Sequence, residues 1–137
     1  MIFEKYHVKD IEKEYFSLHD DVFGKDPFHY PNIVYIAKIN AQYIGFISGY
    51  WHDKKTFYIQ KTAISKKLKG QGLSAEFAIN AWQFLKEKEK IRYLLGQIET
   101  DNISPIITAL KTGWKINGYF TDTIGKQYIR TILDLGN

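Results

Sequence analysis

The sequence predicts an α/β domain of mixed α+β type, built on one central, mostly antiparallel sheet of about six or seven strands with flanking helices. Segments rich in β-branched and aromatic residues, which favour strands, alternate with segments whose apolar residues recur at helical spacing. Glycine, asparagine and aspartate fall between these segments, where turns are needed. A length of 137 residues, 45% of them hydrophobic, suits a single domain over residues 1–137. The predicted order of elements is β-α-β-β-β-α-β-α-β-β.

The first strand is predicted over residues 2–8, and Asp10 is placed to cap the helix that follows. This helix has one apolar face, formed at a spacing of three or four residues by Ile11, Tyr15, Leu18 and Val22. Gly24 marks its end, because glycine readily adopts the left-handed conformation that follows many helices. The pattern therefore predicts one strand and one amphipathic helix before residue 25.

Residues 25–32 combine turn formers with aromatic rings, as either a substrate-facing wall or a packed surface loop would. Two segments with strand composition follow over residues 33–39 and 43–51, and residues 40–42 join them as an antiparallel hairpin. A further strand over residues 56–64 continues this meander.

From residue 72 to about residue 88 the pattern becomes helical, with an apolar stripe formed by Leu73, Phe77, Ala81 and Leu85. We expect this face to pack on the sheet. A compact apolar strand follows over residues 93–99.

The next helix is expected to begin at Ser104 and Pro105, with the serine as cap and the proline in the first helical position. Gly113 is expected to end this helix. The last two strands, over residues 114–120 and 127–135, then form a hairpin.

The composition excludes several kinds of site. The chain has no cysteine, which excludes disulfides and thiolate metal sites. His7, His19, His29 and His52 are scattered without an H-x-x-x-H pair, so we expect them at surface or turn positions and expect no metal site. Neither a signal-peptide pattern nor a run of about 18 apolar residues is present, so we expect a cytoplasmic protein. The net charge of +4 is compatible with an anionic ligand.

The most informative stretch is KKLKGQGLS, residues 66–74, which places a basic, glycine-bearing turn directly before the amphipathic helix. Backbone N–H groups at a helix start have no partner within the helix, and the helix dipole adds partial positive charge there. Glycine also lets the main chain approach a phosphate closely. The stretch therefore indicates a site for a phosphorylated ligand, with a solvated basic loop as the alternative.

The order of elements and this turn resemble the GNAT family of N-acetyltransferases, and the resemblance covers nearly the whole chain. The family's acyl-CoA signature is Arg or Gln, two residues, Gly, one residue, and Gly or Ala, and residues 67–72 match it except at the first position. Lys67 stands there, which keeps the charge but loses the planar fork of arginine. Three shorter matches occur in the family's order: Ile44-Gly45-Phe46, Asn102 and Gly113-Trp114.

This resemblance implies acetyl-CoA as the acyl donor and no metal. It also implies that strands 56–64 and 93–99 splay apart around the pantetheine arm, and that the diphosphate meets the turn before the long helix. The cofactor-binding residues implied in this way are Thr62, Ala63, Ile64, Lys67, Lys69, Gly70, Gln71, Gly72, Leu73, Ser74 and Asn102. For Asn102, a helix-cap or turn role is the alternative.

Acetyl transfer to an amine requires that an ammonium group with a pKa of about 10 lose a proton. Glu99, at the end of strand 93–99, is the candidate base, and a surface carboxylate is its alternative. Tyr58 and Gln60 could instead hold a water that relays the proton.

Many members of the family carry a tyrosine as general acid four residues before the glycine of their Gly-Phe pair, and this chain has Ala109 there. The candidate replacements are phenols of the last hairpin, Tyr119 and Tyr128. If neither serves, the protein is slow or no longer catalytic.

The resemblance also indicates residues near an acceptor amine. Carboxylates that would attract a cationic amine, or that would be solvated surface charges, are Asp20, Asp21 and Asp26. Aromatic residues that could shape the acceptor pocket, or pack in the core, are Phe28, Tyr30, Tyr50 and Trp51.

The leading hypothesis is an N-acetyltransferase that moves an acetyl group from acetyl-CoA to a primary amine of a small molecule or peptide, by direct attack in a ternary complex. The first alternative is a catalytically weak or inactive GNAT-fold module that binds acyl-CoA or a partner. The second is a small basic nucleic-acid-binding protein, although lysine and glutamate alternate over residues 86–90, which indicates a solvated helix. Family members often pair through their last strands, which implies a homodimer through residues 127–135.

Overall fold

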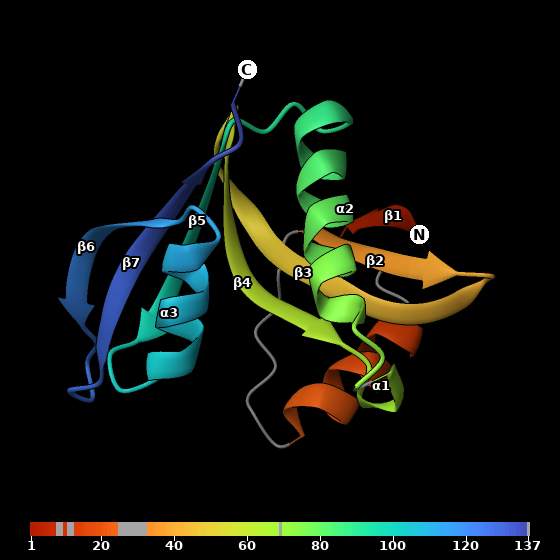
Figure 1. The fold of residues 1–137 in the computed structure, drawn as a ribbon, viewed down its shortest axis with the longest axis horizontal. Helices are drawn as coiled ribbons and strands as arrows, with labels where there is room; N and C mark the ends of the chain where they lie inside the picture. Colours follow the sequence, from red (N-terminus) through yellow and green to blue (C-terminus); the bar gives the residue numbers. More distant parts are fainter. Residues whose placement is uncertain (8–9, 11–12, 25–32, 69, 137) are drawn as a thin grey trace.

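The computed structural model describes residues 1–7, 10, 13–24, 33–68 and 70–136, which form a seven-stranded sheet in the order β1-β2-β3-β4-β5-β7-β6 (Figure 1). The strands are β1 (Ile2–His7), β2 (Ile33–Ile39), β3 (Gln42–Asp53), β4 (Thr56–Ile64), β5 (Tyr93–Glu99), β6 (Lys115–Thr121) and β7 (Gln127–Asp134). The helices are α1 (Lys13–Phe23), α2 (Leu73–Glu87) and α3 (Ile103–Lys111), with a short 3-10 turn η2 (Lys66–Leu68). Some sequence predictions concern residues outside this description: Val8, Ile11, His29, Lys69, and the loop 25–32 with Asp26, Phe28 and Tyr30.

The prediction of a mostly antiparallel sheet with flanking helices is confirmed. Each pair of neighbouring strands is antiparallel except β4 and β5, which run parallel. The crossover between these two strands contains α2, as a parallel connection requires. The element order matches the predicted one throughout the described residues.

Two apolar clusters lie on opposite faces of the sheet. On one face, α2 buries Phe77, Ala81 and Leu85 against strands β2 to β5, as its predicted stripe requires. On the other face, α1 buries Tyr15 and Leu18 against β2, β3 and β4. Figure 1 shows α2 crossing the first half of the sheet and α3 lying beside β5 and β7. The first half of the sheet is thus covered by α2 on one face and by α1 on the other.

Most element boundaries agree with the sequence to within one or two residues, and two differences have a clear cause. The hairpin between β2 and β3 turns through Asn40 and Ala41 alone, because both have positive φ, 50° and 65°, as a tight two-residue hairpin requires. Gln42 therefore belongs to β3 rather than to the turn. At the end of α1, Gly24 has φ of 57° and its N–H donates to the carbonyl of Asp20, which confirms the predicted stop.

The predicted start of α3 is wrong by a small shift. Asn102, and not Ser104, occupies the N-cap position, with no side-chain cap bond, and the helix begins at Ile103. The N–H of Asn102 donates to the carbonyl of Glu99 at 3.0 Å, so the chain turns directly from β5 into the helix. Pro105 still lies in the first turn, where a missing N–H breaks no helical bond.

Strand β4 contains a β-bulge in its middle. Lys61 pairs with Ser48, but the next pair is Ile59 with Gly49, so Gln60 is an extra residue without a partner on β3. A bulge changes the phase of side-chain alternation along a strand. As a result, Ile59 packs in the cluster below α2, while Lys61 turns to the opposite face, toward α1.

Candidate functional site

The sheet opens between β4 and β5. These strands pair only at Thr56 with Tyr93, Phe57 with Leu94 and Tyr58 with Leu95, after which they diverge. A cleft of about 580 Å³ lies between the diverging strands. Its lining comes from both strands and from α2, α3 and β7, and Figure 1 shows β5 and β7 turning away from β4 beside α3.

Two residues of β4 direct main-chain polar groups into this gap. The N–H of Ser65 donates to the carbonyl of Ile44 at 2.8 Å, and the pairing of β4 with β3 continues from there without a shift as far as residue 61. N–H and C=O groups of an antiparallel strand point alternately toward and away from the partner. The N–H and C=O groups of Thr62 and Ile64 therefore point into the gap, whereas those of Ala63 bond to β3.

The glycine turn predicted to hold a diphosphate precedes α2 in the structure. Gly70 and Gly72 have φ of 85° and 70°, values that glycine adopts without strain. Gly72 is the N-cap residue of α2 and supplies no side-chain cap, and among the described residues beyond its chain neighbours no atom lies within 4 Å of where its Cβ would stand. The first N–H groups of the helix, from Leu73 and Ser74 onward, have no partner within the helix and lie next to this exposed turn.

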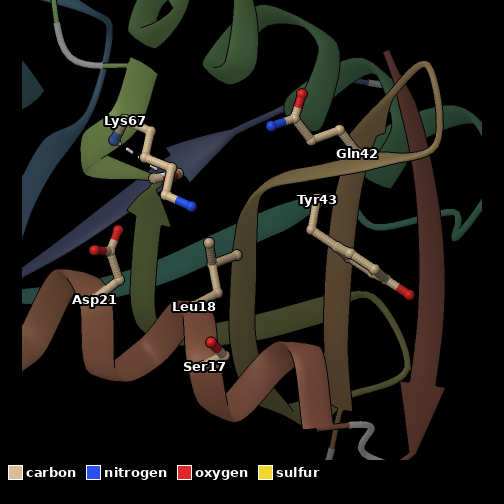
Figure 2. Close-up of a pocket in the computed structure, with 7 residues that line it drawn as sticks. Ser17, Leu18, Asp21, Gln42, Tyr43 and Lys67 are labelled. Atoms are coloured by element: carbon tan, nitrogen blue, oxygen red, sulfur yellow. Dashed lines mark hydrogen bonds between the residues drawn. The ribbon is translucent and has the colours of Figure 1, made fainter.

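Lys67 lies on the other side of this turn. Its side chain lines a separate pocket of about 320 Å³ between α1 and η2, and Figure 2 shows its ammonium group directed toward Leu18 of α1. The main-chain N–H of Lys66 donates to the Asp21 carboxylate at 3.1 Å, which ties η2 to α1. The structure therefore does not bring Lys67 to the cleft.

Glu99 and Asn102 do line the cleft, at the end of β5 where the gap is open. The Glu99 carboxylate forms an ion pair with Lys126, with 2.9 Å between Oε1 and Nζ. Ala109 lines the same cleft, so the position at which the family often has a tyrosine faces the gap without a phenol. Asn102 combines the two roles considered for it, because it is both the N-cap residue of α3 and part of the cleft wall.

The two phenols of the last hairpin are placed differently. Tyr119 is 58% exposed and is not part of the described cleft lining, whereas Tyr128 is. The hydroxyl of Tyr128 donates to the Asp122 carboxylate at 3.4 Å. Desolvation and the negative charge of Asp122 raise the pKa of Tyr128 above its ordinary value, so its phenol stays protonated but is a weaker acid than an ordinary tyrosine.

Gln60 presents an unusual acceptor to the cleft. Its Oε1 is buried and has no hydrogen-bond partner among the described residues. A buried acceptor without a partner costs about 1–3 kcal/mol, which a bound water or ligand would recover. Nearby, burial and the adjacent Tyr50 raise the pKa of Tyr58 to about 12.

His19 is a residue whose position the sequence did not predict. It is buried, at 1% exposure, rather than on the surface. Its Nε2 lies 2.8 Å from Nζ of Lys61, which lines the cleft and also sits 4.6 Å from the centre of the Phe23 ring. Since His19 is one helical turn after Tyr15 on the buried face of α1, its spacing was the signal that could have identified it.

The predicted acceptor residues do not gather at the cleft. Asp20 is exposed beside His19, and Asp21 is held by the main chain of η2. Trp51 packs in the core against Phe57, whereas Tyr50 stacks on Tyr58 at a ring distance of 4.9 Å.

Comparison with known proteins places this geometry in context. The model of the acetyltransferase (GNAT) family matches residues 2–106. An L-2,4-diaminobutyric acid acetyltransferase from Oceanobacillus iheyensis is 29% identical over 97 residues, which are 65% of this chain and 52% of that protein. The chain thus spans about half the length of this curated relative.

Solved structures agree in fold. A GNAT family acetyltransferase from Elizabethkingia anophelis with acetyl-CoA bound has a TM-score of 0.66 at 14% identity, over 97% of both chains. An IAA acetyltransferase from Bacillus cereus has a TM-score of 0.64 at 16% identity, over 97% of this chain and 98% of that one. No helix within the described ranges has the length and apolar character needed to cross a membrane.

Proposed function

Because this chain belongs to the acetyltransferase (GNAT) family, we propose that it transfers an acetyl group from acetyl-CoA to a primary amine within a ternary complex. The observation that carries this proposal is the cleft between β4 and β5, where the β4 edge at Thr62 and Ile64 lies beyond the last described pairing with β5 and Thr62 lines the cleft. An extended amide-bearing chain can bond such an edge as a further strand would. The pantetheine arm of acetyl-CoA has that form.

The residues of the cleft and turn fit the two ends of this molecule. Thr62, Ile64 and Asn102 would bond the pantetheine amides, and the N–H groups that follow Gly72 would bond the diphosphate. The open space around Gly72 supports this assignment, because no side chain within the described ranges comes within 4 Å of its Cβ position to compete with an anion.

In the reaction, a C–N bond forms between the amine and the acetyl carbon, the C–S bond breaks, and the thiolate of coenzyme A takes up a proton. We propose Glu99 as the group that accepts the amine's proton, because it lies in the cleft and its carboxylate is held by Lys126. We propose Tyr128 as the proton donor to the thiolate, because it lines the cleft that Ala109 leaves without a phenol. Tyr119 lies outside this lining and is the weaker candidate.

Gln60 would contribute by position rather than by proton transfer. Its buried Oε1 lies at the bulge, where the strands separate and where the amine and thioester would meet. An amine N–H or an ordered water could satisfy this acceptor. Its location supports the notion that a water links the amine to the base.

Ala109 also favours a second candidate function, an acyl-CoA-binding module without turnover. The two functions share the cofactor and differ in chemistry. Binding and catalysis must therefore be measured separately.

The test begins with thermal melts in the presence of acetyl-CoA, of coenzyme A and of a short oligonucleotide. A ligand at one hundred times its Kd stabilises the native state by about 2.7 kcal/mol, which raises the melting temperature by several degrees. We expect a shift with the first two and none with the third. An oligonucleotide shift without an acetyl-CoA shift would contradict the proposal.

Turnover is then followed by thiol release with a panel of primary amines. The panel includes L-2,4-diaminobutyrate, because the curated relative is named for its acetylation. Thiol release that depends on an amine supports acetyl transfer. A full acetyl-CoA shift with no release across the panel would favour the binding module instead.

A further inference from the structure

A second cavity, of about 410 Å³, opens beside the cleft and is lined by residues of β3 to β7. It shares Gly96, Gln97 and Thr131 with the cleft, so the two spaces meet at the middle of β5. Pockets of this size hold small-molecule ligands. An acceptor in this cavity would therefore lie next to the cleft assigned to acetyl-CoA.

This cavity opens on the face of the sheet that carries α1. Leu94 and Leu133 pack in the cluster below α2 on the opposite face. Gln97 is three residues from Leu94 on β5, and Arg130 is three residues from Leu133 on β7. Because side chains on a strand alternate between faces, Gln97 and Arg130 lie on the α1 face. These two residues pair directly across β5 and β7, and both line the cavity.

Arg130 supplies positive charge at the cavity. The described residues that line it include Arg130 and His52 but no aspartate or glutamate. The guanidinium carbon of Arg130 lies 4.6 Å from the centre of the Phe120 ring, which holds the side chain in place. Within the described part of the chain, the ion pairs found do not involve Arg130.

A second cation stands on the other side of the gap. Lys61 faces α1 from β4, three residues beyond the last pairing of β4 with β5. Gln97, opposite Arg130, is two residues beyond the same point on β5, which corresponds to about 7 Å along the strand. Lys61 lines the cleft rather than this cavity, so Arg130 is the cation placed to bind an acceptor there, and Glu99, which also lines the cleft, pairs with Lys126.

We propose that this cavity is the acceptor subsite and that it selects primary amines that also carry a carboxylate, which Arg130 binds. The planar fork of arginine matches the two oxygens of a carboxylate. The inference rests on the proposed acetyl transfer, and it replaces the expectation that acidic residues attract a purely cationic amine.

The Tyr50–Tyr58 pair supplies the wall beside this group. The ring centres lie 4.9 Å apart, and burial raises the pKa of Tyr58 to about 12, so its phenol stays protonated well above neutral pH. A protonated phenol can donate to a carboxylate oxygen, whereas a phenolate would repel it. This wall therefore adds to the preference for an anion.

The experiment compares amines in pairs that differ only in the carboxylate: L-ornithine with putrescine, and L-lysine with cadaverine. Acceptor binding is measured by calorimetry with coenzyme A present, and kcat/KM is measured with acetyl-CoA. We expect the amino acid of at least one pair to be favoured about tenfold or more in both measurements, the range of a charged hydrogen bond. Arg130→Gln should bring this ratio close to one, and Arg130→Lys should retain part of it.

Arg92→Gln is the matched control, because Arg92 lies outside the cavity and pairs with Asp134 at 2.7 Å. It should leave the ratio unchanged. If Arg130→Gln fails to fold, as judged by circular dichroism, the reduced ratio in Arg130→Lys carries the test.

The outcomes separate this inference from the proposed function. Equal or stronger use of the diamines overturns the inference, while thiol release with the diamines leaves acetyl transfer standing. Binding that depends on both the carboxylate and Arg130 supports the inference even if no thiol is released. In that case the proposed acetyl transfer is contradicted while the inference stands. Failure of every amine to bind overturns the inference.

Discussion

Replacing Gly72 with glutamate tests the proposed diphosphate site, because this residue caps α2 and leaves the first turn of the helix open. Gly72 has φ of 70°, and in the part of the structure that is described nothing beyond its chain neighbours lies within 4 Å of where its Cβ would stand. A side chain there therefore costs chiefly the left-handed backbone conformation, about 1–2 kcal/mol. A carboxylate near the helix start recovers about 0.3–1 kcal/mol through the helix dipole. We expect Gly72→Glu to lower the free energy of unfolding by about 1 kcal/mol.

The effect on binding should be larger. Two unit charges about 6 Å apart repel by about 2.8 kcal/mol at an effective dielectric constant of about 20, which corresponds to roughly a hundredfold loss of affinity. Gly72→Gln is the matched control, because it imposes the same backbone strain without the charge. The difference between these two variants isolates the electrostatic contribution.

The assay is a thermal melt with and without acetyl-CoA, followed by calorimetric measurement of Kd. Wild type and Gly72→Gln should keep most of the ligand-induced shift, whereas Gly72→Glu should lose most of it while remaining folded. Equal affinity of the glutamate and glutamine variants would refute the placement of the diphosphate at this turn.

Three further substitutions, with Gly118→Ala as a control for one of them, test the cleft and the sheet. Glu99→Gln should lower kcat/KM at pH 7 by about a hundredfold but recover above about pH 10, where the free amine needs no base, and a loss independent of pH would remove Glu99 as the base. Tyr128→Phe should lower kcat about tenfold or more with little change in KM, and an unchanged kcat in steady-state assays would exclude its phenol as the proton donor. Gly49→Ala should lower the free energy of unfolding by more than about 3 kcal/mol, because its Cβ would lie 1.9 Å from the carbonyl oxygen of Tyr58. Gly118→Ala, whose nearest neighbouring atom is at 3.4 Å, should cost less than about 1 kcal/mol in the same denaturant titration, and equal losses would contradict this reasoning.

Much of the fold could be predicted because the responsible patterns are local. The bounds of β4 and β5 agree with the predicted strands at residues 56–64 and 93–99, since β-branched and aromatic composition marks both ends of each strand. The start of α3 was displaced because it depends on how tightly the chain turns after Glu99, which side-chain preferences alone do not determine. The bulge at Gln60 depends on the pairing register with β3, so the sequence of β4 alone carries no sign of it.

The candidate site was predictable to a smaller degree. Thr62 and Asn102 lie at the cleft, as expected for residues that would contact the pantetheine arm. The side chain of Lys67 lines the pocket between α1 and η2, a placement that the sequence did not indicate. The contact of Lys61 with His19 joins residues on β4 and α1 that are distant in sequence. Arg130 reaches the second cavity only because β7 inserts between β5 and β6, a topology that the sequence did not reveal.

The short parallel contact between β4 and β5 divides the sheet into two parts that can respond separately to a ligand. Within the described sheet, three residue pairs join the parts, and the edge-to-face contact of Trp82 with Trp114 adds a connection through α2. A molecule lodged in the gap would contact both parts at once and so restrain their relative motion. Amide hydrogens of β6 and β7 should then exchange with solvent more slowly, while those of β1 and β2 change little. Hydrogen exchange in the C-terminal strands would thus report occupancy of the gap even in a variant that performs no chemistry.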